Sequence, residues 1–287
     1  MKASITYWTI GGFDGAVPVV EAAHTAQELG FDAIELSFGI GELTPATDPT
    51  TLSRLGEAIR AEGVEIASLC TDAYWEHSLG SPDPNEQEAA IEFTAAYIRA
   101  ARALGTDAVL VIPGTVDVPW DPTRPVVPAP VVHDIAQESI AQLLPVAEEE
   151  DVVIALENVW GKFLTGPFEY RTFIDSFGSP HVKAYFDVGN VVVNGYPEDW
   201  IDVLNGRIER VHVKNFQRQD GGGTLNDFTD NLMQGDVRWD LVFRSLKEVG
   251  YDGYLTAEML VSDQELPDTD LAAQVAQDLR EMIEFFC

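Results

Sequence analysis

Short apolar segments alternate with amphipathic segments along the whole chain, and this alternation restricts the fold more than any other feature. Eight segments rich in β-branched and aromatic residues have the character of buried strands. They span residues 4–9, 32–38, 65–71, 108–113, 152–158, 183–189, 210–215 and 254–260. Eight segments with a helical spacing of apolar residues lie between and after them. These span residues 19–30, 51–63, 86–105, 133–150, 167–178, 197–206, 240–250 and 271–286.

Glycines end many of the predicted helices, and a predicted strand follows each within a few residues. Gly30, Gly63 and Gly105 are examples. Glycine is common at this position because it readily adopts the left-handed conformation that often ends a helix. Eight strands and eight helices in 287 residues predict a (β/α)₈ TIM barrel, with residues 1–287 as a single domain. The alternative is a doubly wound open sheet, which usually has fewer strands. That fold often carries a GxGxxG motif after its first strand, and no such motif follows the first predicted strand here.

The chain is strongly acidic. Asp and Glu number 48 against 17 Lys and Arg, which gives a formal net charge of -31. Such a surface repels nucleic acid and anionic membranes, so we expect neither as a partner. An acidic surface with few lysines is tolerated where salt screens it, since molar salt shortens the Debye length to ~3 Å. We therefore expect a halophilic source, and the alternative is an ordinary acidic cytosolic protein.

The chain carries no recognisable targeting or membrane-spanning segment. Its first residues, MKASITYWTIGG, do not form a basic and then apolar leader. No apolar run approaches the ~20 residues that span a bilayer. We therefore expect a soluble, cytoplasmic protein. Its oligomeric state stays open, because the apolar C-terminal MIEFF could pack on the barrel or on a second subunit of a homo-oligomer.

The fifth to eighth predicted strands each carry one metal-ligating side chain at or near the C-terminal end: Glu157, Asp187, His212 and Glu258. A TIM barrel places its active site at this end, and neighbouring strands lie only ~4.8 Å apart. Asp187 lies in an apolar strand, where an ionised carboxylate must be paired, protonated or metal-bound. Three oxygen ligands and one imidazole favour Mn²⁺, Mg²⁺ or Co²⁺, with Zn²⁺ as the alternative. Four unrelated polar residues, each paired locally, are the competing interpretation.

Other side chains near the predicted mouth are candidates for substrate contact. His77 follows the third strand, in TDAYWEHSLG. Trp8, Trp75 and Trp160 follow the first, third and fifth strands, and they could form a wall for the apolar face of a sugar, although core packing is the more common role. The long segments after the fourth and seventh strands are predicted to be lids.

Several short segments resemble those of a known superfamily: ALEN (155–158), FDVGN (186–190), RVHVKNF (210–216), QGDVRW (234–239) and LTAEM (255–259). They are similar to the xylose-isomerase-like TIM-barrel superfamily of sugar and sugar-phosphate isomerases and epimerases. The resemblance spans nearly the whole chain. It looks closest to the group labelled hexulose-6-phosphate isomerase or L-xylulose-5-phosphate 3-epimerase, and it implies a small sugar or sugar phosphate as substrate.

The resemblance also implies roles for individual residues. The metal ligands of the family match Glu157, Asp187, His212 and Glu258. In the related ketose 3-epimerases the two glutamates are also the acid/base pair, and a substrate arginine lies six residues after the histidine, which here is Arg218. A substrate histidine of those enzymes is replaced by Asn190, which fits the phosphopentulose epimerase-like group. Lys214 and Arg218 could hold a phosphate, but Lys214 could equally be an internal ion-pair partner.

The resemblance implies proton transfer next to a carbonyl, with the metal as a Lewis acid that stabilises an enediolate. Glu157 and Glu258 would remove and return the proton. We expect a ketose or ketose-phosphate 3-epimerase. The alternatives are an aldose–ketose isomerase, a dehydratase of an inosose or similar keto-sugar, and a non-catalytic sugar-binding barrel. A DNA-repair endonuclease of the same superfamily is disfavoured, because it would need a basic cleft and more metal histidines.

Overall fold

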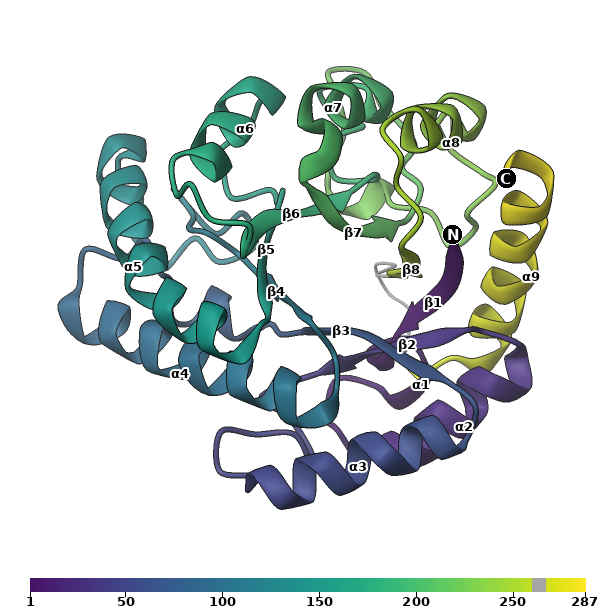
Figure 1. The fold of residues 1–287 in the computed structure, drawn as a ribbon. Coiled ribbons are helices and arrows are strands. Elements are labelled where there is room, and N and C mark those ends of the chain that lie inside the picture. The colour runs from purple at the N-terminus through teal and green to yellow at the C-terminus, as the bar shows by residue number, and fades with distance from the viewer. Residues whose placement is uncertain (260–266) are drawn as a thin grey trace.

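Eight parallel strands close into a barrel in chain order, as the alternation predicts (Figure 1). The computed structural model describes residues 1–259 and 267–287. The strands are β1 (Lys2–Thr6), β2 (Ala33–Ser37), β3 (Glu65–Cys70), β4 (Ala108–Val111), β5 (Val153–Glu157), β6 (Val182–Asp187), β7 (Ile208–Val213) and β8 (Tyr254–Ala257). The first strand pairs with the last, with Lys2 opposite Tyr254. This closure excludes the doubly wound open sheet.

The predicted helices lie outside the barrel (Figure 1). They are α2 (Val19–Leu29), α3 (Pro49–Ala61), α4 (Pro84–Leu104), α5 (Ala129–Glu150), α6 (Pro167–Asp175), α7 (Pro197–Leu204), α8 (Trp239–Glu248) and α9 (Thr269–Phe286). Helices α2 to α8 lie between successive strands, and α9 follows the last strand. Three short 3₁₀ helices are η1 (Ala73–Trp75), η2 (Asn205–Arg207) and η3 (Leu225–Asp227). Gly30 and Gly105 follow α2 and α4 in the left-handed conformation, as predicted. None of the helices in the described part of the chain combines the length and apolar character that a bilayer crossing requires.

The first strand is shorter than predicted. It ends at Thr6, and the next residues form a short helix, α1 (Tyr7–Gly11), whose side chains are all buried. The hydroxyl of Tyr7 donates a hydrogen bond to the carbonyl of Val17 at 2.5 Å. Tertiary packing therefore overrides the strand propensity of this aromatic and β-branched run. At the other end of the chain β8 stops before Glu258, and Leu260, predicted to belong to the same strand, lies outside the described residues.

The interior of the barrel is polar, whereas the apolar core lies between the strands and the helices. Along β7 and the residue that follows it, Arg210, His212 and Lys214 alternate with Val211 and Val213, so the two sets face opposite sides of the sheet. The three charged side chains are at most 6% exposed. Each of them therefore needs a partner inside the barrel.

Arg210 spans the interior near the N-terminal ends of the strands. Its Nε donates to the carbonyl of Ala67 on β3 at 2.7 Å, and one terminal nitrogen donates to Glu209 at 2.8 Å. The other terminal nitrogen contacts Asp107. The guanidinium also lies 5.3 Å from the ring centroid of Tyr254. This one side chain thus ties together β3, β7 and β8.

We expect Arg210→Met to lower the free energy of unfolding by about 2 kcal/mol or more, because the carbonyl of Ala67 loses its donor inside the barrel. Urea unfolding at fixed salt concentration measures the effect. Arg99→Met is the control: Arg99 is exposed and lies 4.0 Å from Glu150, so the change should be about 0.5 kcal/mol or less. Equal losses in the two variants would contradict a structural role for Arg210.

Candidate metal centre

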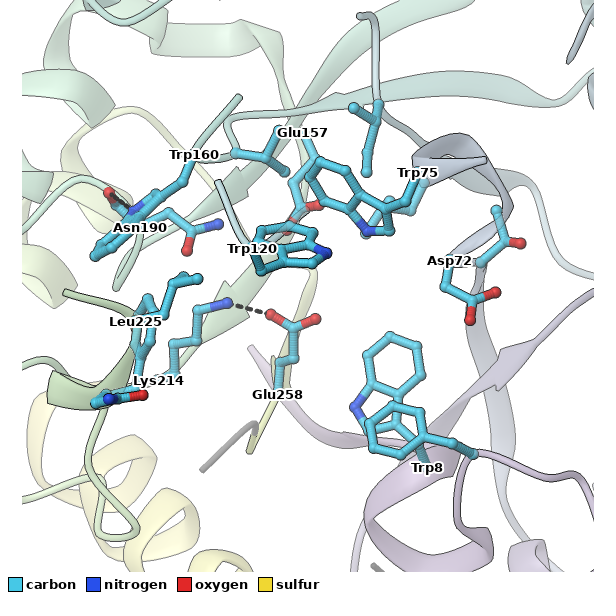
Figure 2. Close-up of a pocket in the computed structure, with 17 residues that line it drawn as sticks. Trp8, Asp72, Trp75, Trp120, Glu157, Trp160, Asn190, Lys214, Leu225 and Glu258 are labelled. Carbon is cyan, nitrogen blue, oxygen red and sulfur yellow. Dashed lines mark hydrogen bonds and ion pairs between the residues drawn. The ribbon is translucent and has the colours of Figure 1, made fainter. Parts of the chain in front are cut away.

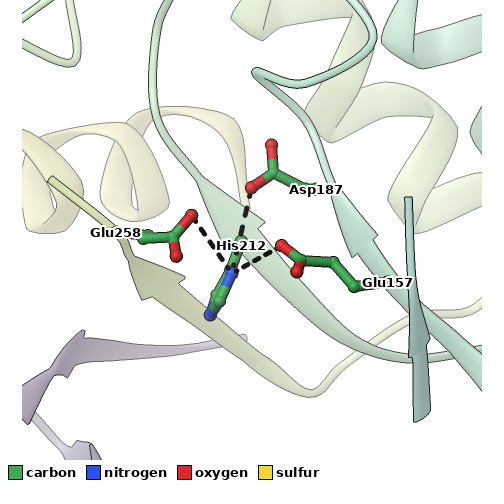
Figure 3. A group of neighbouring side chains, drawn as sticks. All are labelled: Glu157, Asp187, His212 and Glu258. Carbon is green, nitrogen blue, oxygen red and sulfur yellow. Dashed lines mark ion pairs between the residues drawn. The ribbon is translucent and has the colours of Figure 1, made fainter. Parts of the chain in front are cut away.

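The four predicted ligands meet at the C-terminal mouth of the barrel. The strand register places Asp187 beside His212, and Glu258 follows β8, the next strand. One ligand atom from each of the four residues lies within 4.8 Å of the other three. Figure 3 shows the carboxylates of Glu157, Asp187 and Glu258 turned toward the imidazole of His212. All four side chains are buried.

His212 lies at the centre of this cluster. Its Nδ1 is 3.4 Å from Glu157 Oε1, 3.8 Å from Asp187 Oδ2 and 3.5 Å from Glu258 Oε2. Among the residues that the structure describes, Nδ1 of His212 is buried without a hydrogen-bond partner, whereas Oδ2 of Asp187 accepts no hydrogen bond but forms an ion pair with Lys214. A buried nitrogen without a partner is costly in a dry interior, and a cation bound there would satisfy it. The donor set therefore fits a divalent metal ion.

Sequence reasoning missed Glu35, which contacts the ring nitrogen of His212 that does not face the three carboxylates. This residue of β2 is fully buried, and its Oε2 lies 2.8 Å from His212 Nε2. Its Oε1 accepts hydrogen bonds from Ser68 Oγ at 2.8 Å and from the Tyr185 hydroxyl at 2.6 Å. A carboxylate at Nε2 fixes the ring and directs Nδ1 toward a metal. The available signal was an acid inside an apolar strand, the same signal that singled out Asp187.

Two asparagines hold Asp187 in position. The backbone N–H of Asp187 donates to Asn158 Oδ1 at 2.8 Å, and Asn158 Nδ2 donates to the Asp187 carbonyl at 2.9 Å. The backbone N–H of Asn190 donates to Asp187 Oδ1 at 2.7 Å. With Oδ1 engaged in this way, Oδ2 is the oxygen directed at the centre. Asn190 also lines the pocket described below, as a predicted substrate contact should.

Lys214 lies inside the cluster. Its Nζ is 2.9 Å from Asp187 Oδ2 and forms an ion pair with Glu258. Although burial lowers the pKa of Lys214, the charges of Asp187 and Glu258 raise that pKa above its usual value, so the ammonium stays charged. Gly189 leaves room for this side chain, since a Cβ there would lie 2.5 Å from Lys214 Cγ. The ion pairs expected for Lys214 are therefore present, and its side chain also lines the pocket described below.

The two glutamates have opposite electrostatic environments. Burial raises the pKa of Glu157 to about 7, although the neighbouring imidazole of His212 acts to lower it. Burial also acts on Glu258, but the charges of Lys214 and His212 outweigh it and lower the pKa of Glu258. Although burial lowers the pKa of His212, Glu35 and Glu258 raise it well above its usual value. In the absence of a cation, the cluster therefore binds protons at neutral pH.

A pocket of about 520 Å³ opens above the cluster (Figure 2). Glu157 and Glu258 line this pocket. Asp187 and His212 are fully buried and do not belong to its described lining. A molecule that enters the pocket would therefore meet the two glutamates, with the other two ligands behind them.

Aromatic side chains form much of the pocket wall. The three predicted tryptophans, Trp8, Trp75 and Trp160, all belong to its lining. Two aromatic residues that sequence reasoning did not single out join them from the predicted lids. The ring of Trp120, from the loop after β4, lies 4.4 Å from that of Trp75, and Phe228, from the loop after β7, lies 5.4 Å from Trp160. Both long segments thus supply pocket walls.

Two predicted substrate contacts lie away from the pocket. Arg218 Nε donates to the carbonyl of Val192 at 2.7 Å, and a terminal nitrogen donates to that of Gly195 at 2.5 Å. Its guanidinium lies 4.6 Å from the ring centroid of Tyr196. Arg218 therefore fastens the loop after β6. His77 is exposed beyond η1 and, like Arg218, is absent from the described pocket lining.

Comparisons with known proteins agree with this architecture. A family model described as xylose isomerase-like TIM barrel matches residues 23–285. The putative L-ribulose-5-phosphate 3-epimerase SgbU of Escherichia coli (strain K12) is 26% identical over 246 residues, which cover 82% of this chain and 81% of that protein. L-ribulose-5-phosphate 3-epimerase UlaE of Escherichia coli O1:K1 / APEC is 24% identical and covers 92% of this chain and 91% of its own. The solved structure of an L-ribulose 3-epimerase superposes with a TM-score of 0.79 at 18% identity, over 99% of this chain and 95% of that one.

We expect Glu35→Gln to weaken Mn²⁺ binding by about 10- to 100-fold, because His212 loses the charged partner that orients its ring. Isothermal titration calorimetry measures the dissociation constant. Glu65→Gln is the matched control, since Glu65 lies at the exposed start of β3 and outside the cluster. An unchanged affinity in Glu35→Gln would show that Glu35 does not support the ligand.

We also expect Mn²⁺ binding to release protons and to strengthen as pH rises. His212 and Glu157 bind protons in the cation-free cluster and must lose them to act as ligands. Because the pKa of Glu157 is about 7, affinity should fall as pH falls through that value, by about tenfold per pH unit for each proton released. Calorimetry in two buffers of different ionisation enthalpy counts the protons. Equal heats in both buffers would contradict the expectation.

Proposed function

The chain belongs to the xylose isomerase-like TIM barrel family, and from that premise we propose that it is a metal-dependent enzyme that epimerises a ketose at C3. The observation that carries the proposal is the buried cluster of Glu157, Asp187, His212 and Glu258. The pocket above it has the volume of a small-molecule site. The names of the two relatives and the structural neighbour, all 3-epimerases, support the reaction class.

The cluster is proposed to hold one divalent cation through its three carboxylates and the Nδ1 of His212. Mn²⁺, Mg²⁺ and Co²⁺ match this oxygen-rich donor set, with Zn²⁺ as the alternative. When bound, such a cation supplies positive charge beside the substrate carbonyl. The buried Nδ1 of His212, which has no hydrogen-bond partner among the described residues, supports this assignment.

Glu157 and Glu258 are proposed to move the proton at C3. Both line the pocket, and they extend from β5 and β8, the two ends of the arc of four strands that carries the cluster. A ketose between them would present one face of C3 to each carboxylate. One glutamate would then take the proton from carbon, and the other would return a proton from the opposite face, which inverts the centre.

Two other reactions would begin with the same proton removal. Aldose–ketose isomerisation needs one carboxylate to carry the proton between C1 and C2, and a keto-sugar dehydratase would go on to expel water. The placement of the two glutamates on opposite arms of the arc favours epimerisation, because isomerisation makes no use of the second face. A non-catalytic sugar-binding barrel would need neither glutamate to reach the pocket.

We expect the Mn²⁺-loaded protein to exchange the C3 hydrogen of a ketose for deuterium in D₂O, followed by NMR. Glu157→Gln and Glu258→Gln should each slow this exchange by about 10²- to 10⁴-fold. Glu76→Gln, an exposed glutamate outside the described lining of the pocket, is the control and should exchange at the original rate.

The metal content of every variant must be measured, because the two glutamates are also proposed ligands. Rates are compared only between samples saturated with Mn²⁺. Deuterium at C1 in place of C3 would show that the protein is an aldose–ketose isomerase and not a 3-epimerase. Release of an unsaturated product would identify a dehydratase. An absence of exchange across a panel of ketoses and ketose phosphates would refute the proton-transfer mechanism.

A further inference from the structure

The described lining of the pocket above the cluster offers no free cation. Lys214 is the single basic side chain in its described lining, and both Asp187 and Glu258 already pair with it. The remaining charged groups of the described lining are acids: Asp72, Glu157 and Glu258.

Basic residues on the neighbouring loops are engaged elsewhere. Arg218 donates to two backbone carbonyls of the loop after β6. Lys162, on the loop after β5, pairs with Asp117 and lines an adjacent hollow, not this pocket. Arg238, just before α8, pairs with Glu198. A phosphate group in the pocket would therefore meet no unpaired ammonium or guanidinium from these loops.

The pocket wall on both sides of Glu258 contains aromatic rings and amides, whereas a phosphate group would need cations there. In Figure 2, Trp8 and Trp75 lie on one side of Glu258, and Trp160 and Asn190 lie on the other. A ligand with its reacting carbon between the two glutamates thus meets aromatic side chains at both ends. Such side chains pack against the C–H faces of a sugar, and amides bond its hydroxyl groups. A phosphate dianion would lose its hydration there and gain no charged partner.

We propose that this pocket selects an uncharged ketose over the terminal phosphate ester of the same ketose. The inference rests on the proposed function, because it names the substrate class of that same site. It sets this chain apart from the two relatives whose names specify a phosphate ester.

The test compares a five-carbon 2-ketose with its 5-phosphate, using the Mn²⁺-loaded protein. Equilibrium binding and C3 deuterium exchange are both measured, at about 0.1 M and about 2 M salt. We expect the ketose to bind and exchange at least about 100-fold better than the ester. This preference should persist at high salt, where the repulsion from the net charge of -31 is screened. Equal or better use of the ester at high salt would overturn the inference.

Two variants of one residue test whether the charge of the pocket wall determines the preference. Trp120 is 48% exposed on the loop after β4, so it tolerates substitution. Trp120→Arg adds a cation to the aromatic wall, and we expect it to shift the preference toward the ester by about tenfold. Trp120→Leu removes the ring without adding charge and should leave the ratio of ester to ketose binding unchanged. A similar shift in both variants would contradict the charge argument.

The two readouts separate this inference from the proposed function. Selective binding of the ketose without exchange would refute epimerisation and leave the inference standing. Exchange of the ester alone would support epimerisation and overturn the inference. Binding of neither compound by the metal-loaded protein would overturn both.

Discussion

Two cationic side chains hold together four carboxylates buried inside this barrel. His212 touches Glu35 with one ring nitrogen and faces the three candidate ligands with the other. Lys214 pairs with Asp187 and Glu258. Each of these acids alone would be expensive to bury as an anion. Their pairing also links β2 to β7, strands that share no backbone ladder, so the same contacts that shape the site also fix the barrel around it.

The fold and the cluster could be predicted because both follow local rules. The spacing of apolar residues within short segments indicates which segments are strands and which are helices. Glu157 and Asp187 lie at strand ends, where parallel strands bring side chains together. The partners of Glu35 could not be predicted in the same way, since its contact with His212 joins residues 177 positions apart. The orientation of the Arg218 side chain depends on the two backbone carbonyls that accept its hydrogen bonds. Its position six residues after a histidine gives no information about those carbonyls.

The site divides its tasks between two kinds of structure. The cluster lies on strand ends that are buried and hydrogen-bonded, which suits ligands that must keep a fixed geometry. The pocket walls come from the segments that follow β1, β3, β4, β5 and β7, which contribute Trp8, Trp75, Trp120, Trp160 and Phe228; Trp8 lies in α1 and Trp75 in η1, and the other three lie in loops. Loops vary more readily than strands. Members of one family can therefore keep a common reaction while their loops change the molecule on which it acts.

The pairing of β1 with β8 has a consequence for how the protein is made. β1 is synthesised well before β8, although the two strands are neighbours and Lys2 pairs with Tyr254. Joining such distant segments is slow in general, since a long loop must close before its contacts form. Glu258 directly follows β8, so the ligand cluster is complete only when the barrel closes. A cation bound there would stabilise the closed barrel alone, so it would shift the balance from open chains toward closed ones.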